Sequence, residues 1–106
     1  MADKPLARVI QSGDLRMDCV RRRFSRSGEF IDLTPREFDL LKALMRRSGD
    51  VLSREHLLTY VWGKATSVNP NNVETLIRSL RAKMDHKWPS RVIQTVRLQG
   101  YRLKSQ

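Results

Sequence analysis

NPNNVETLIRSLRAKM, residues 69–84, is the stretch around which the fold of this chain is organised. On a helix its apolar residues fall at i, i+3, i+4, i+7 and i+11, a stripe wide enough to pack on a core. These residues are Val73, Leu76, Ile77, Leu80 and Met84. The opposite side carries Asn71, Thr75, Arg78 and Ala82, flanked by Asn72, Ser79, Glu74 and Arg81. The pattern predicts a helix that is anchored on one side and is polar and basic on the other.

The polar side of this helix suits a DNA groove. Small side chains at Thr75, Ser79 and Ala82 let the backbone approach whatever it meets, and Asn and Arg can form bidentate hydrogen bonds to base edges and phosphates. A surface helix of any basic protein also shows a few such residues to water. The helix alone therefore supports both interpretations equally, and the rest of the chain decides between them.

The composition of the chain points to an anionic partner. Its 106 residues have room for one modest core, so we expect a single domain, residues 1–106. Lys and Arg outnumber Asp and Glu 21 to 11, and the resulting net charge of +10 is enough to attract a polyanion from a distance. Nucleic acid is the first candidate, and an acidic membrane surface is the second.

The sequence also bears on location. No apolar run approaches the length of a bilayer-spanning helix, and the first residues lack the apolar core of a signal peptide. Cys19 is the single cysteine, so no internal disulfide can form, and it is most simply a small buried residue. These features predict a cytoplasmic protein without membrane contact.

Residues 6–32 have the pattern of a small antiparallel sheet. Short apolar pieces alternate with turn signals at Gly13-Asp14 and Ser27-Gly28, and residues 26–29 lie between two β-prone runs as a hairpin tip. The segment also holds a dense positive cluster, which consists of Arg21, Arg22, Arg23 and Arg26. The cluster could bind phosphate or an acidic partner, but a solvated sheet face is the favoured interpretation, because such faces need charge for solubility.

The middle of the chain predicts two short helices. Thr34-Pro35-Arg36-Glu37 combines a capping threonine, a proline at the first helical position and a glutamate that can complete a capping box. Apolar residues then recur at helical spacing, and Gly49 stops this helix. After a short bridging strand at Val51-Leu52, Ser53 caps a second helix, which Gly63 ends.

The third helix and the tail complete a DNA-binding pattern. Asn69 and Pro70 look like its cap and first position, and the spacing is typical of a helix-turn-helix whose last helix reads DNA. Beyond it, residues 92–96 and 101–103 predict a hairpin with Arg97 at the tip. Because arginines enter narrow minor grooves, we expect Arg97 to do so beside the helix. A solvent-exposed hairpin arginine is the alternative.

Several spaced motifs resemble the C-terminal effector domains of OmpR/PhoB-type bacterial response regulators. In order they are LTPREFDLLKALMRRSGDVLSREHLL (33–58), VWG (61–63), NNVETLIRSLRAKM (71–84) and IQTVRLQGYRL (93–103). The likeness spans residues 15–103. It implies an α+β winged helix-turn-helix fold, with an N-terminal four-stranded antiparallel sheet, three helices and a C-terminal hairpin wing.

The resemblance also implies a function and partners. It implies sequence-specific binding of double-stranded promoter DNA for transcriptional regulation, as a homodimer or in tandem on direct-repeat half-sites and without a cofactor. The loop at residues 62–68 would face RNA polymerase or the neighbouring protomer. Such effector domains follow a receiver domain that holds a phosphorylated aspartate, and no receiver is expected in this chain because the remaining length cannot house one. The chain is then either an isolated fragment or a protein that works without phosphorylation.

Carried over onto matching positions, the resemblance implies a set of DNA-contacting residues. On the reading helix and the wing they are Asn71, Asn72, Thr75, Leu76, Arg78, Ser79, Arg81, Thr95 and Arg97, and Arg54 and Trp62 match positions that often touch phosphates. Two departures stand out. Ser79 replaces a common second arginine, which predicts a weaker or differently selective major-groove contact. The wing has the sequence Arg97-Leu98-Gln99-Gly100-Tyr101 in place of Arg-Gly-x-Gly-Tyr. This difference predicts another type of turn and another direction for the Arg97 side chain.

Two other functional classes compete with DNA binding. A protein-interaction winged helix that meets an acidic protein would need an exposed apolar patch on the reading helix, where only Leu76 hints at one. An enzyme is not expected. His56 and His86 have no Cys or carboxylate at metal-ligand spacing, and neither a Gly-rich phosphate loop nor a nucleophile motif is present.

Overall fold

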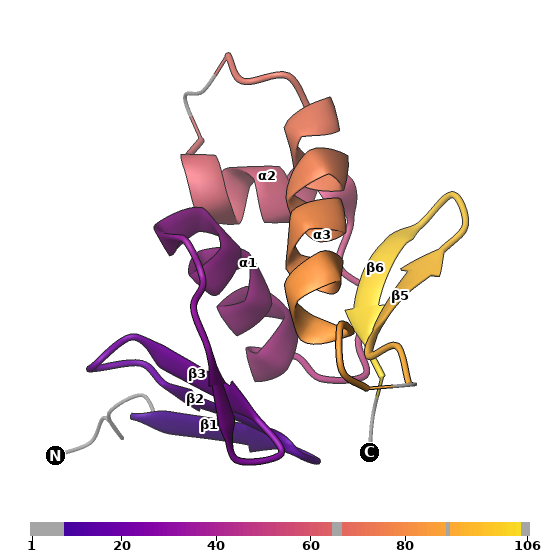
Figure 1. Cartoon of the computed structure of the whole chain (residues 1–106). Helices are drawn as coiled ribbons and strands as arrows, with labels where there is room; N and C mark the ends of the chain where they lie inside the picture. The colour runs from indigo at the N-terminus through magenta and orange to yellow at the C-terminus, as the bar shows by residue number, and fades with distance from the viewer. Residues whose placement is uncertain (1–7, 65–66, 89, 105–106) are drawn as a thin grey trace, which may run out of the picture.

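The computed structural model describes residues 8–64, 67–88 and 90–104, in which three helices stand between a four-stranded sheet and a two-stranded hairpin (Figure 1). Their order is β1 (Val9–Ser12), β2 (Leu15–Asp18), β3 (Arg23–Arg26), β4 (Glu29–Ile31), α1 (Pro35–Arg46), α2 (Arg54–Trp62), α3 (Asn71–Met84), β5 (Ile93–Val96) and β6 (Gly100–Leu103). This architecture confirms the predicted α+β winged helix-turn-helix. No helix within the described ranges is long and apolar enough to cross a membrane.

The N-terminal sheet is a meander with strand order β1-β2-β3-β4, all antiparallel. Its last hairpin turns through two residues, Ser27 and Gly28, whose φ angles of 51° and 82° fit the positive-φ turns that suit twisted hairpins. Arg26 pairs with Glu29 across this turn, so the predicted hairpin tip at residues 26–29 is confirmed. The first hairpin turns through the predicted Gly13-Asp14 pair, where only Gly13 has a positive φ, of 58°.

Helices α1 and α2 begin at their predicted caps. The Glu37 amide donates to the Thr34 hydroxyl at 3.2 Å and the Thr34 amide donates to Glu37 Oε1 at 2.8 Å, which completes the capping box. The Ser53 hydroxyl accepts from the His56 amide at 3.0 Å, and Gly63 ends α2 with a φ of 95°. These termini are confirmed because each depends on residues within one turn of the helix end.

The start of α3 differs slightly from its prediction. The helix begins at Asn71, one residue after the expected first position, and Pro70 takes the place just before it. The Asn69 carboxamide oxygen still accepts a hydrogen bond from the Asn71 amide at 2.8 Å. Asn69 therefore ties down the start of the helix, although the regular helix begins later than predicted.

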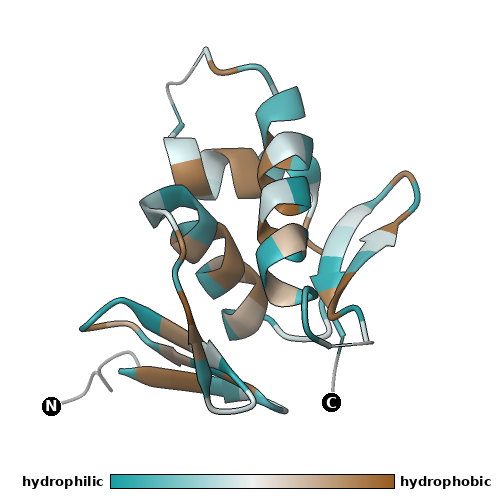
Figure 2. Cartoon of the chain, viewed as in Figure 1, coloured by the Kyte–Doolittle hydropathy of each residue, from teal (hydrophilic) through white to brown (hydrophobic). Residues whose placement is uncertain are grey.

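The core lies where the three helices meet one another, the sheet and the hairpin. Figure 2 shows hydrophobic and polar residues alternating along each helix, and buried hydrophobic residues come from all three helices. The α3 stripe is confirmed: Val73, Ile77, Leu80 and Met84 are buried, and Leu76 is partly buried at its edge. This packing leaves one side of α3 free to face outward.

The C-terminal hairpin is fastened to the body at its base. Leu52, from the short strand predicted at residues 51–52, forms an isolated β-bridge with Tyr101, with hydrogen bonds of 2.8 and 3.0 Å between their backbones. At Gly100, whose φ is 145°, a Cβ atom would lie 2.0 Å from the carbonyl oxygen of Leu52. Only glycine allows this close approach, so the root of the hairpin is held tightly and its tip projects beside α3 (Figure 1).

The interpretation of the arginine cluster as a solvated face is wrong for Arg26, whose side chain is 1% exposed. Its guanidinium donates to the carbonyl oxygens of Met84 at 2.8 Å and Ser90 at 3.0 Å, and to Asp85 Oδ1 at 3.0 Å. It also lies over the Trp88 ring, 4.9 Å from the centroid. Arg21, Arg22 and Arg23 are exposed, as expected. Sequence periodicity missed Arg26 because its acceptors come from residues about 60 positions away.

Candidate nucleic-acid interface

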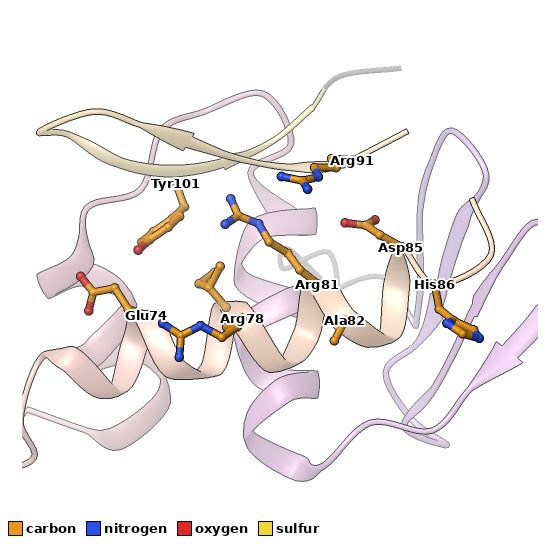
Figure 3. A pocket seen from close by; sticks show the side chains of 9 residues that line it. Glu74, Arg78, Arg81, Ala82, Asp85, His86, Arg91 and Tyr101 are labelled. Atoms are coloured by element: carbon orange, nitrogen blue, oxygen red, sulfur yellow. The ribbon is translucent and has the colours of Figure 1, made fainter. Parts of the chain in front are cut away.

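A groove of about 540 Å³ runs between α3 and the wing, the hairpin of β5 and β6 (Figure 3). Its lining residues are Glu74, Ile77, Arg78, Arg81, Ala82, Asp85, His86, Arg91 and Tyr101. Three arginines against two carboxylates give the lining an excess of positive charge. Burial, and then the nearby Glu74 carboxylate, raise the pKa of Tyr101, so its hydroxyl stays protonated at neutral pH.

The outer face of α3 is exposed as predicted, at Asn71, Asn72, Thr75 and Arg78. The Thr75 hydroxyl donates to the Asn71 carbonyl oxygen at 3.3 Å, and the Asn72 side-chain amide donates to the Asn69 carbonyl oxygen at 3.0 Å. Arg78 makes no hydrogen bond or ion pair with another residue in the described part of the chain. Its guanidinium is therefore free to bind a partner.

The guanidinium of Arg81, which was expected to contact DNA, makes hydrogen bonds within the domain. Its Nε and Nη2 atoms donate to the carbonyl oxygen of Ile93 at 3.2 and 3.0 Å, and Nη2 also donates to the Thr95 hydroxyl at 2.8 Å. Arg81 thus links α3 to β5, as Figure 3 shows by its reach toward the wing. Arg81 and Thr95 are brought together by this structure, but as a link between the two elements.

Ser79 is turned toward α1 and away from the exposed face. Its hydroxyl donates to Glu37 Oε2, while Glu37 Oε1 accepts from Lys83 Nζ at 2.7 Å and from the Thr34 amide. Burial raises the pKa of the Glu37 carboxyl, but the hydrogen bonds from Lys83, Ser79 and Thr34 outweigh it and hold the pKa below its usual value. The expected base contact of Ser79 gains no support, because its hydroxyl is already occupied.

Arg54 and Trp62 lie at opposite ends of α2 and are not brought together. Arg54, at the end nearer the wing, pairs with Glu74 at 3.0 Å and lines a second hollow that reaches Thr95 and Gly100. Trp62 is half-buried at the far end, where the Arg36 guanidinium lies 5.2 Å from its ring centroid. Only Arg54 borders the space between helix and wing.

The wing tip is a turn through Arg97, Leu98 and Gln99, all exposed. The Gln99 amide donates to the Val96 carbonyl oxygen at 2.9 Å, and Leu98 has a φ of 66°. Within the described ranges Arg97 has no hydrogen-bond or ion-pair partner. The tip therefore presents an unpaired guanidinium beside the outer face of α3.

Arg91 is a groove residue that the sequence interpretation missed. It lies just before β5, is exposed, and lines the α3–wing groove together with Arg78 and Arg81 (Figure 3). Its only sequence signal was a basic residue directly preceding the first strand of the wing. Such a signal is too common in a chain with 21 basic residues to single it out.

The outer face of α3 lacks the feature that a protein-interaction module requires. Leu76, the one apolar candidate, is partly buried and packs against the core. The large exposed hydrophobic residues of the described chain lie elsewhere, at Val20, Phe30, Tyr60 and Leu98. A polar helix face beside a basic groove remains, and that is a surface for a polyanion.

The fold and this groove define the class of the protein, a winged helix-turn-helix domain of the DNA-binding kind. Residues 28–103 match the family described as "Transcriptional regulatory protein, C terminal". The chain belongs to that family, the effector domains of OmpR/PhoB-type response regulators, which are regulators of transcription. The resemblance seen in the spaced motifs is thereby confirmed.

Relatives and solved structures show the extent of the likeness. The chain is 40% identical over 96 residues to the transcriptional activator protein IrlR of Burkholderia pseudomallei, which covers 91% of this chain and 42% of IrlR. It is 38% identical over 95 residues to the transcriptional regulatory protein CusR of Escherichia coli, with coverages of 90% and 42%. The DNA-binding domain of Klebsiella pneumoniae RstA, solved in complex with the RstA box, aligns with a TM-score of 0.80 at 29% identity, over 92% of this chain and 98% of that one. The chain thus spans less than half the length of the two curated relatives.

Proposed function

We propose that this domain binds double-stranded DNA sequence-specifically, with the outer face of α3 in the major groove and the wing tip in the adjacent minor groove. The observation that carries the proposal is the pair Arg78 and Arg97. Both are exposed without partners in the described chain, and they stand on the two elements that flank one basic groove. An unpaired guanidinium is suited to bidentate recognition of a guanine edge and to a narrow minor groove.

The other residues take supporting roles in this proposal. Asn71, Asn72 and Thr75 meet base edges or nearby phosphates from the exposed first turns of α3. Arg54 and Arg91 meet phosphates along the groove, and Trp62, at the far end of α2, meets a more distant phosphate. Arg81 and Thr95 hold the wing at a fixed distance from α3, so that both prongs enter their grooves together. Phosphate contacts position the protein, while contacts to base edges select the sequence.

The proposal includes partners that the fold alone does not specify. Two copies would bind direct-repeat half-sites in promoter DNA, in the cytoplasm, and the 62–68 loop would face RNA polymerase or the second copy. Residues 65–66 of that loop lie outside the described part of the chain. Support comes from the relatives, since IrlR is named a transcriptional activator and RstA was solved with its DNA box.

Selection of bound sequences from a random duplex pool tests the proposal. We expect enrichment of a half-site, repeated in tandem if two copies bind. Binding titrations then compare the enriched duplex with a random one. Arg78→Ala should reduce the preference between them, because each good base contact discriminates by about 1–3 kcal/mol. Arg23→Ala, which removes the same charge from the distant N-terminal sheet, is the matched control. Enrichment of no sequence would contradict sequence-specific binding. If Arg78→Ala weakens binding to both duplexes equally, Arg78 does not contact bases.

A further inference from the structure

Leu98 at the wing tip is unusual in two independent ways. Its side chain is 98% exposed, more than any other large hydrophobic residue of the described chain. Its backbone has a φ of 66°, in the left-handed region that glycine and asparagine adopt readily and leucine does not. Figure 2 shows a hydrophobic segment in the turn of the otherwise polar tip. Neither the exposed apolar side chain nor the positive φ stabilises the free domain. Both are therefore better explained by contact of Leu98 with a binding partner.

The hairpin holds this tip in place. Its base is fixed by the Leu52–Tyr101 bridge and by Arg81, and a hydrogen bond of 2.8 Å between Arg102 Nε and Gln94 Oε1 joins the two strands. The turn itself is closed by the hydrogen bond from Gln99 to Val96. Leu98 is therefore presented at a defined position, next in the chain to the unpaired guanidinium of Arg97.

We propose that Leu98 is a minor-groove contact that reads A·T against G·C base pairs beneath the wing. This inference rests on the proposed function and adds a second reading residue to it. Where Arg97 enters the minor groove, the next side chain meets the sugar walls and the groove floor. The floor of an A·T pair is lined by adenine N3 and thymine O2, whereas a G·C pair adds the protruding amino group of guanine. An apolar side chain fits against the first and is obstructed by the second, and apolar side chains are used in this way by other minor-groove proteins.

The test uses two substitutions, one that removes the apolar side chain and one that keeps it. Leu98→Asn tolerates the positive φ and removes the apolar side chain, so the Tm of the free domain should stay constant or rise by roughly 4 °C. Leu98→Met keeps an apolar side chain of similar volume and serves as the control. Both are titrated with a short duplex that carries the selected half-site, and with the same duplex in which G·C pairs replace the A·T pairs under the wing.

We expect Leu98→Asn to raise the Kd on the A·T duplex about tenfold, because part of a leucine side chain is no longer buried. Replacing the A·T pairs with G·C pairs should then raise the Kd of Leu98→Asn by a smaller factor than the Kd of the wild type. The dependence of Kd on salt should not change, since no charge is lost. Leu98→Met should bind within about twofold of the wild type, since volume-conserving apolar substitutions are tolerated best.

Two results would overturn the inference. The first is an unchanged Kd for Leu98→Asn on both duplexes. The second is unchanged binding to a single half-site with weaker cooperative binding to a double site, which would assign Leu98 to contact with a second copy. Arg78→Ala and Arg97→Ala are measured alongside. If these two lose affinity and Leu98→Asn does not, only the present inference fails, whereas if none of the three loses affinity, the proposed function itself fails.

Discussion

Arg26 joins three separated parts of the chain at one buried guanidinium. It comes from β3 and donates to Met84 at the end of α3, to Asp85 just after it, and to Ser90 on the way to the wing. Its Nε atom also lies 3.5 Å from the Asp14 carboxylate. A buried charge is tolerated only when its hydrogen bonds are made, so these contacts depend on one another.

Replacing Arg26 should therefore be costly. Arg26→Met keeps part of the apolar stem but leaves the Asp85 carboxylate and two carbonyl oxygens without this donor. We expect a loss of about 3–5 kcal/mol in the free energy of unfolding, measured by urea denaturation. Arg23→Met, on the exposed end of the same strand, should change it by no more than about 0.5 kcal/mol. Equal effects of the two substitutions would show that the buried network contributes nothing.

Glu37 makes the stability of the domain depend on pH. Its pKa in the folded state lies below the ordinary value of 4.5, because hydrogen bonds from Lys83, Ser79 and Thr34 outweigh the effect of burial. A lowered pKa contributes stability that is complete above the unfolded value and is lost as the pH falls through the folded value. The contribution should thus be present at neutral pH and disappear in the range below pH 4.5.

Glu37→Gln tests this contribution directly. At pH 7 the substitution should lower the free energy of unfolding by about 1–3 kcal/mol, since a buried charged acceptor is lost. At an acidic pH well below 4.5 the cost should shrink, because the wild-type carboxyl takes up a proton as the pH falls through its lowered pKa. Lys83→Met, which removes one donor, should reduce the same pH dependence. A cost of Glu37→Gln that is equal at both pH values would contradict the assignment.

At the scale of elements, the sequence predicted what depends on neighbours along the chain. The capping box at Thr34, the cap at Ser53 and the turn at Ser27-Gly28 each involve residues a few positions apart, and all are confirmed. The outer face of α3 was only partly predictable. Ser79 and Arg81 share its helical periodicity, yet α1 and β5 occupy their polar atoms. Periodicity predicts the direction in which a side chain points. It cannot predict which other element the side chain contacts in the folded chain.

The link from Arg81 to β5 should couple the two DNA-binding elements. If Arg81 positions the wing, Arg97→Ala should weaken DNA binding about tenfold in the wild type but less than about threefold in an Arg81→Met background. Amide exchange of β5 in the free protein should also become faster in Arg81→Met. Thr95→Val, which removes one of the acceptors, should show the same effects more weakly.

Independent losses from Arg81→Met and Arg97→Ala would give a different role to Arg81. Multiplicative effects on Kd, with unchanged exchange in β5, would mean that Arg81 contacts DNA on its own, as the family resemblance implies. The double-mutant comparison separates the two roles because positioning acts only through the wing.

At the scale of the whole molecule, the net charge of +10 predicts strong attraction to a polyanion but not where it binds. The fold shows which unpaired arginines stand beside the α3–wing groove, whereas others, such as Arg16 and Arg21, lie on the N-terminal sheet. Several are engaged within the protein, including Arg22 with Asp39, Arg26 with Asp85 and Arg54 with Glu74. Arg78, Arg91 and Arg97, by contrast, lack such partners in the described chain and gather along α3 and the wing. The net charge could be counted from the sequence, whereas the positions of these three arginines in space could be known only from the fold.

Salt dependence should reveal the same distribution. With about five phosphate contacts per copy, the logarithm of the binding constant should fall against the logarithm of salt concentration with a slope of about −4 to −5. Arg91→Ala should make the slope about one less steep, while Arg23→Ala should leave it unchanged. Equal changes of the slope in Arg91→Ala and Arg23→Ala would mean that DNA binding depends on the net charge and not on the arginines of the groove.

The position of Arg26 in the chain also bears on how far this domain can be shortened. Arg26 lies just before residues 28–103, the part that matches the family, and its contacts lie at the far end of that part. A fragment trimmed to the matching residues would keep every side chain proposed to touch DNA, and yet it would leave the exit of α3 without its fastening. We therefore expect that fragment to be less stable than the whole domain, so that the first three strands would support DNA recognition through the fold.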